Sequence, residues 1–171
     1  LRVVIDDEGY APTPEKAIAV IRQLLPPLEK EGIILAIENH DRFSAETLES
    51  IIQRTSEELV GICLDTANSL GAGQGINEVL AILAPYTVNL HVKDIHINRV
   101  PGNMGFAIEG SIAGEGLIDI TNIIRKLGKT GRCLTATLEL WVKENENVQN
   151  TIDKEQQWVD KSIQYLKTIL S

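Results

Sequence analysis

Residues 33–40, with the sequence IILAIENH, decide the fold because a run of apolar residues is followed at once by Glu38. A continuous apolar run of this length is typical of a strand buried on both faces of a parallel sheet. The pattern recurs at residues 59–65, LVGICLD, which end in Asp65, and at residues 88–91, VNLH, which end in a histidine. Three buried strands are therefore predicted, each with a polar side chain at its carboxyl end.

Helical spacing of apolar residues separates these runs. Residues 14–31 carry apolar side chains three and four positions apart, with Thr13 as the expected cap and Pro14 at the first helical position. The pair Pro26 and Pro27 should kink or split this helix, because proline removes a backbone donor. Further helices are expected after Ser44, near residues 76–84, around residues 118–127 and at residues 151–170.

The alternation of strands and helices predicts an α/β fold with parallel strands. Glu38, Asp65 and His91 follow one another at intervals of 27 and 26 residues, which is room for a strand, a helix and two loops. A last strand is expected at residues 134–138, ending in Glu139. Between His91 and that strand, the glycine-rich connection at residues 95–116 is expected to be a mobile loop over a pocket.

A doubly wound open sheet would satisfy the alternation, but polar groups from consecutive strands that meet at one centre suit the top of a (β/α)8 TIM barrel better. A complete barrel needs about 250 residues. The chain has 171 residues and supplies about five βα units, so we expect a partial barrel whose N-terminal strands are missing. We expect residues 1–171 to form a single domain, the C-terminal portion of a barrel.

Composition narrows the class of partner and the compartment. A net charge of -8 offers no basic surface for nucleic acid or anionic lipid. No apolar stretch approaches the ~20 residues of a membrane span. Cys63 and Cys133 both lie inside apolar runs, away from the strand ends, and are expected to be buried free thiols. We therefore expect a cytoplasmic protein with neither nucleic acid nor membrane as a partner.

The four residues at the strand ends, Glu38, Asp65, His91 and Glu139, form a donor set for a divalent ion. Carboxylates with one imidazole suit Mn²⁺, Mg²⁺ or Co²⁺, whereas Zn²⁺ favours thiolates and is not excluded. Such an ion could hold two neighbouring substrate oxygens and stabilise the enediolate formed when the adjacent C–H loses its proton. Taken singly, each carboxylate could equally be a solvated loop residue and His91 a core histidine.

Short motifs in the same order resemble the sugar phosphate isomerase/epimerase family, within the xylose-isomerase-like TIM-barrel superfamily. They are residues 37–40 (IENH), 61–68 (GICLDTAN), 89–94 (NLHVKD), 114–119 (GEGLID) and 138–141 (LELW). The resemblance implies that Glu38, Asp65, His91 and Glu139 bind one metal ion. It also implies that Glu38 and Glu139 are catalytic and exchange the substrate proton on opposite faces.

Candidate substrate-binding residues lie near these ligands: His40, Asn68, Lys93 and Arg99. Asn68 departs from the family, whose epimerases usually place a histidine three residues after the metal aspartate. An asparagine can donate a hydrogen bond to a hydroxyl group but cannot titrate near neutrality. Instead of contacting substrate, Lys93 could equally form a plain salt bridge, and Arg99 could equally lie in a solvated loop.

The resemblance implies a metal-dependent isomerase or epimerase of carbohydrate metabolism, acting on a small sugar or sugar-like ketone. An inosose dehydratase-like lyase and a catalytically inactive metal-binding barrel fragment are the alternatives. Endonuclease IV shares the barrel but uses many histidines, and this acidic chain has only His40, His91 and His96. The exposed strand edges of a partial barrel predict a homo-oligomer.

Overall fold

Two compact units make up the computed structural model, which describes residues 1–170. The first unit comprises Leu1–His91 and Lys126–Ala136, and the second comprises Val92–Arg125 and the chain from Thr137 onward. Each unit is described by itself. The expectation of a single domain stays a prediction.

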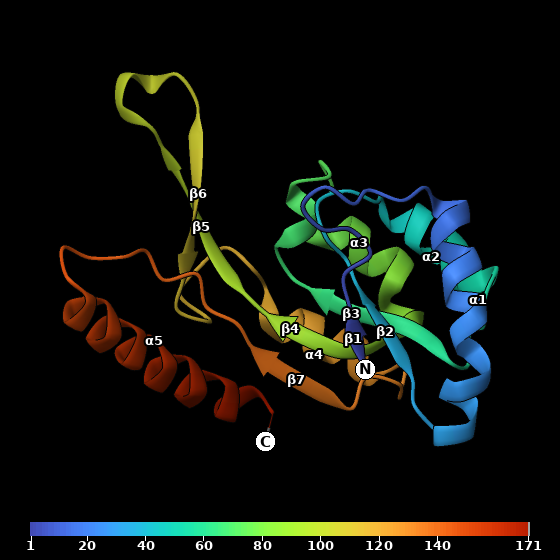
Figure 1. Ribbon diagram of the computed structural model, residues 1–171. Helices are drawn as coiled ribbons and strands as arrows, with labels where there is room; N and C mark the ends of the chain where they lie inside the picture. Colours follow the sequence, from blue (N-terminus) through green and yellow to red (C-terminus); the bar gives the residue numbers. More distant parts are fainter. Residues whose placement is uncertain (171) are drawn as a thin grey trace. The chain divides into compact units, whose positions relative to one another are not determined.

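Parallel strands in chain order form the main sheet (Figure 1). Within residues 1–170 this sheet has five strands, in the order β1 (Arg2–Val3), β2 (Leu35–Glu38), β3 (Val60–Asp65), β4 (Thr87–Val92) and β7 (Thr135–Leu138). The pairs β1–β2, β2–β3 and β3–β4 are parallel. Sequential parallel strands of this kind are the curled half of a barrel, so the predicted α/β class and partial (β/α)8 architecture are confirmed.

Helices follow the strands as predicted. Their bounds are α1 (Pro14–Glu31), α2 (Ala45–Gln53), α3 (Ile76–Leu83), α4 (Ile120–Gly128) and α5 (Val148–Ile169). The expected caps are present, because Thr13 accepts from the backbone N–H of Lys16 and Ser44 accepts from that of Thr47. Figure 1 shows α1, α2 and α3 beside one another in the first unit, next to strands β1 to β3.

The proline pair does not split helix α1. Helix α1 runs through Pro26 and Pro27 without a break. Both prolines are exposed, and so are Arg22 and Gln23, whose carbonyl groups lose their helical donors. Water can satisfy these carbonyl groups at an exposed position, so the cost of the proline pair stays small enough for the helix to continue.

The connection at residues 95–116 contains two strands, where the sequence predicts a mobile loop. Its two sides form an antiparallel hairpin of β5 (Asp94–Arg99) and β6 (Phe106–Ser111), with Ile97 opposite Ile108 (Figure 1). Alternating polar and apolar residues in β5 carried this signal, whereas β6 begins with three consecutive apolar residues. Met104 and Phe106, which lie in this connection, are both exposed.

The core of the first unit is apolar at the positions that the helical and strand patterns predict. Ile18 and Ile21 of α1, Ile51 and Ile52 of α2, and Leu80 of α3 are all buried. Cys63 is buried and Cys133 is half-buried, and both are free thiols. Burial raises the pKa of the Cys133 thiol. No helix in residues 1–170 combines the length and the hydropathy of a membrane span.

Candidate metal centre

The register of the first unit's strands places the predicted ligands on one face of the sheet. Glu38 of β2 lies opposite Cys63 of β3, and Asp65 of β3 lies opposite His91 of β4. Alternate residues of a strand point to the same face, so Cys63 and Asp65 share a face. The polar strand ends therefore meet at the carboxyl edge of the sheet, as the sequence predicts.

An irregularity between β3 and β4 sets this register. Ile62 pairs with Thr87, whereas the next residue, Cys63, pairs with Asn89. One extra residue of β4, Val88, is accommodated at a β-bulge. Without the bulge the residue opposite Asp65 would be Leu90, so the bulge is what brings His91 opposite Asp65.

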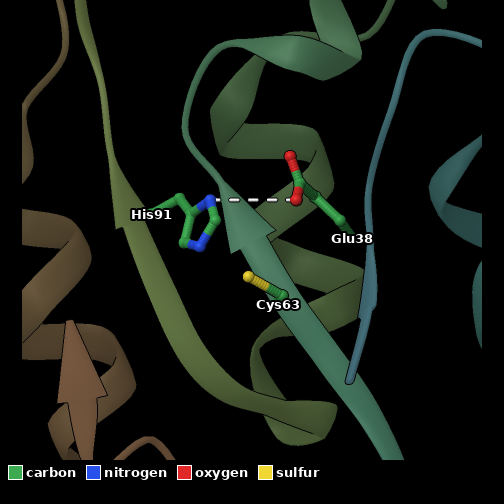
Figure 2. A group of neighbouring side chains, drawn as sticks. All are labelled: Glu38, Cys63 and His91. Carbon is green, nitrogen blue, oxygen red and sulfur yellow. Dashed lines mark ion pairs between the residues drawn. The ribbon is translucent and has the colours of Figure 1, made fainter. Parts of the chain in front are cut away.

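Glu38, Asp65 and His91 each offer a ligand atom, and these atoms lie within 4.8 Å of one another. All three residues are buried, with exposed fractions of 5%, 0% and 8%. His91 Nδ1 lies 3.8 Å from Glu38 Oε2, and Figure 2 shows the two side chains directed toward each other. Two carboxylates and an imidazole at these separations fit a divalent cation, because one ion can replace the water that buried ionic groups would otherwise need.

Backbone and amide contacts orient Asp65. Its Oδ1 accepts hydrogen bonds from the backbone N–H groups of Ala67 and Asn68, at 2.8 Å each. Asn39, fully buried, donates to the backbone oxygen of Asp65 and to Ser69 Oγ, and accepts from the backbone N–H of Asp65. The ends of β2 and β3 are thereby held together before any ion binds.

Glu38 is held from two sides. Arg2 Nη1 forms an ion pair with Glu38 Oε2, and Asn68 Nδ2 donates to Glu38 Oε1 at 3.1 Å. The sequence analysis missed Arg2. The sequence feature that could have identified Arg2 is its charge, because it is the single cationic residue in the otherwise apolar strand β1, which pairs with β2. Asn68, predicted as a substrate residue, contacts the carboxylate of a predicted ligand instead.

Glu139 lies in the second unit, just after β7. Its Oε1 is 2.8 Å from Lys93 Nζ, and Lys93 is only 2% exposed. The ammonium group also lies 4.4 Å from the centroid of the Trp141 ring, a cation–π contact. Of the alternatives open for Lys93, the salt bridge is therefore the one present.

The other predicted substrate residues have local partners. His40 Nδ1 is 2.8 Å from Asp41 Oδ1. Arg99 lies in the hairpin, with its guanidinium group 5.0 Å from the centroid of the Phe106 ring. Asp94, the last residue of the motif at residues 89–94, accepts hydrogen bonds from the backbone N–H groups of residues 95, 114, 116 and 118.

Cys63 is closer to the centre than the sequence suggested. The prediction placed both cysteines away from the strand ends, but Cys63 Sγ lies within 4.8 Å of ligand atoms of Glu38 and His91. A second cluster, of Asp6, His40 and Asp41, also has ligand atoms within 4.8 Å and is more exposed.

Comparisons with known proteins agree with this fold. The sequence model of a family described as xylose isomerase-like TIM barrel matches residues 6–169. A relative from Pectobacterium atrosepticum named 3-oxo-isoapionate decarboxylase is 28% identical over 168 residues, which are 98% of this chain and 61% of the relative. The chain thus spans about three fifths of the length of that relative.

Two solved structures are similar in fold. One is a xylose isomerase-like TIM barrel protein from Mycobacterium smegmatis in complex with magnesium, with a TM-score of 0.67 and 18% identity over 98% of this chain and 54% of that one. The other is D-psicose 3-epimerase from Clostridium cellulolyticum with D-tagatose, with a TM-score of 0.64 and 18% identity over 92% of this chain and 59% of that one.

Proposed function

This chain belongs to the xylose isomerase-like TIM barrel family, and from that premise we propose that its protein is a divalent-metal-dependent isomerase or epimerase of a small sugar or sugar-like ketone. Relatives of this fold include an epimerase crystallised with a ketohexose and a barrel crystallised with magnesium. We propose Mn²⁺, Mg²⁺ or Co²⁺ as the ion, and Zn²⁺ remains compatible with the histidine.

The observation that carries the proposal is the cluster of Glu38, Asp65 and His91, whose ligand atoms lie within 4.8 Å of one another at the carboxyl ends of adjacent strands. Catalytic residues of TIM-barrel enzymes come from this end of the strands. We assign these residues, with Glu139, to the metal. A divalent ion would supply positive charge beside a substrate carbonyl and lower the energy of the anion formed on proton removal.

Proton transfer falls to the two glutamates in this proposal. Asn68 Nδ2 and Arg2 hold the carboxylate of Glu38, and Lys93 holds that of Glu139. Such contacts fix where each carboxylate oxygen points, which a proton acceptor requires. His40, Asn68, Lys93 and Arg99 remain proposed contacts for substrate hydroxyl groups.

Exchange of a substrate C–H with solvent tests this proposal. The metal-loaded protein is incubated in D₂O with a panel of ketoses, and the C–H signal beside the carbonyl is followed by NMR. We expect exchange that requires the metal, is abolished by Glu139→Gln at saturating metal, and survives at the exposed control Glu144→Gln. Absence of exchange with every ketose in the panel would refute the proposal.

A carbon–carbon lyase is the second candidate, favoured by the 28% identity to the decarboxylase over 98% of this chain. Loss of CO₂ from a 3-oxo acid leaves the same kind of anion beside a carbonyl but needs no base to remove a C–H proton. Asn68, which cannot titrate, is compatible with this chemistry. CO₂ release from 3-oxo sugar acids without exchange on ketoses would select it, and water loss from an inosose would select the dehydratase alternative.

We also propose an oligomeric state and a cellular compartment for the protein. An apolar pocket of about 470 Å³ lies along β1 and α1, lined by residues such as Val3, Ile21 and Leu24. We propose that the protein forms a homo-oligomer, since exposed strand edges of a parallel sheet favour pairing between copies. The two free thiols support a reducing compartment, for which we propose the cytoplasm.

A further inference from the structure

We propose that Cys63 is a sulfur ligand of the metal centre and makes it selective for thiophilic divalent ions such as Zn²⁺ and Co²⁺. The inference rests on the proposed function, because Glu38 and His91 belong to both sets of ligands. Mg²⁺ and Mn²⁺ would be held by the oxygen-rich set of the proposed function, Glu38, Asp65, His91 and Glu139. Zn²⁺, and Co²⁺ where both sets are open to it, would be held by Glu38, Cys63 and His91. The kind of metal then decides which of two overlapping sites is filled.

The strand register places Cys63 in the centre. It lies opposite Glu38 and two residues before Asp65, so its side chain is on the ligand face of the sheet. Its sulfur, a carboxylate oxygen of Glu38 and a ring nitrogen of His91 all lie within 4.8 Å of one another. Figure 2 shows the sulfur beside the dashed Glu38–His91 contact, with the three side chains around a common space.

These separations suit coordination. Zinc holds sulfur at ~2.3 Å and histidine nitrogen at ~2.0 Å, so two ligand atoms of a tetrahedral zinc ion are separated by about 3.5 Å. His91 Nδ1 and Glu38 Oε2 are already 3.8 Å apart. The sulfur lies within 4.8 Å of a ligand atom of each of these two residues, and all three residues are at least nine-tenths buried.

A buried cysteine ordinarily acts as a small apolar residue. Cys63 differs because its thiol has polar surroundings: Sγ donates to Asn89 Oδ1 at 3.2 Å. The Asn89 amide is anchored on its other side, where Nδ2 donates to Thr135 Oγ1 at 2.8 Å. When an ion binds, the thiol releases its proton to solvent and the sulfur exchanges its contact with Asn89 for the metal.

Cobalt spectroscopy tests the inference directly. The chain has only one other cysteine, so Cys133→Ser leaves Cys63 as its sole sulfur nucleophile. Titration of the metal-free Cys133→Ser protein with Co²⁺ should produce the near-ultraviolet thiolate-to-cobalt charge-transfer band. The wild type should give the same band, and Cys63→Ser should bind Co²⁺ without it.

Selectivity is the second readout. Cys63→Ser should weaken Zn²⁺ binding at least about tenfold and leave Mg²⁺ binding unchanged, because magnesium does not use sulfur. Circular dichroism checks that Cys63→Ser folds, and if it does not, the Cys133→Ser spectrum decides alone. Bound Co²⁺ without a charge-transfer band in Cys133→Ser would overturn the inference but not the metal centre. Failure of the wild type to bind any divalent ion would overturn both.

Discussion

Asn39 joins the two strand ends that carry Glu38 and Asp65. Its Nδ2 donates a hydrogen bond to the backbone oxygen of Asp65 at 2.9 Å, and its Oδ1 accepts one from the backbone N–H of Asp65 at 2.6 Å. Nδ2 also donates to Ser69 Oγ. These groups are buried, so water cannot replace the amide. At the scale of single residues, the geometry of the proposed metal centre therefore depends on a residue that binds no metal.

Asn39→Ala should destabilise the protein by about 2–4 kcal/mol, because the buried N–H and oxygen of Asp65 lose their partner. Urea unfolding followed by circular dichroism measures this change. Asn98→Ala is the control, since Asn98 is exposed and its amide bonds only the side chain of Glu109 among the contacts described. If Asn39→Ala lowers the free energy of unfolding no more than Asn98→Ala does, the Asn39 amide does not hold the strand ends together.

Glu109 provides a pH-dependent test in the hairpin. The Lys143 ammonium group, 3.1 Å away, and the Asn98 amide lower the pKa of the Glu109 carboxyl group. A depressed folded-state pKa favours the folded state above the ordinary carboxyl pKa, and this contribution is lost as the pH falls through the folded value. Lys143→Ala should raise the pKa of Glu109, as measured by NMR titration, and Lys129→Ala should not. An unchanged pKa of Glu109 in Lys143→Ala would show that Lys143 is not what lowers it.

At the scale of elements, the bulge between β3 and β4 fixes which residues face the centre. Gly61 lies beside it, where a Cβ atom would be 2.8 Å from Tyr86 O and from Val88 Cγ1. The backbone oxygen cannot move without shifting the strand. Glycine is therefore required at this position by the close approach of β4 and not by its own backbone angles.

Gly61→Ala should cost about 1–3 kcal/mol as overpacking and should weaken metal binding as well, because a shift of β4 moves His91. Thermal unfolding and Mn²⁺ titration measure the two effects. Gly128→Ala is the matched control, since nothing lies within 4 Å of its Cβ position, and it should be neutral or slightly stabilising. If Gly61→Ala is destabilised but binds metal as tightly as the wild type, the bulge does not determine the geometry of the metal centre.

The connection from β6 to α4 depends on Asp94. Its carboxylate accepts from the backbone N–H groups of Gly114, Gly116 and Ile118 at 2.9–3.0 Å. Asp94→Asn turns an amide donor toward these donors and should destabilise this connection by about 2–4 kcal/mol. Faster hydrogen exchange at those amides measures the effect, with the exposed Asp160→Asn as control. Unaltered exchange would show that other contacts hold the connection.

The sequence predicts β2, β3 and β4 because each follows from a largely buried apolar run, and it predicts α1 and α2 because each has a capping side chain. The hairpin at residues 94–111 was less visible, since its alternation is short and its glycines resemble a loop. The sequence alone does not show that α1 continues through its proline pair, because exposure of the freed carbonyl groups is a tertiary property. Arg2 and Cys63 could not be assigned to the centre without the strand register.

In the whole molecule, strands adjacent in the chain form a half-barrel, and we propose that its carboxyl edge binds a divalent ion. Such binding stabilises the folded state by about 2.7 kcal/mol when the free ion is present at 100 times its Kd. The stabilisation links the residues of the centre to the folding of the sheet that carries them.

Calorimetric titration of Mn²⁺ into the metal-free 171-residue chain tests this claim most directly. We predict one ion bound per chain, with binding weakened at least about tenfold in Asp65→Asn and unchanged in the exposed control Asp153→Asn. Circular dichroism verifies that both variants are folded. Absence of binding to the wild type, or equal affinity in folded Asp65→Asn, would contradict the account.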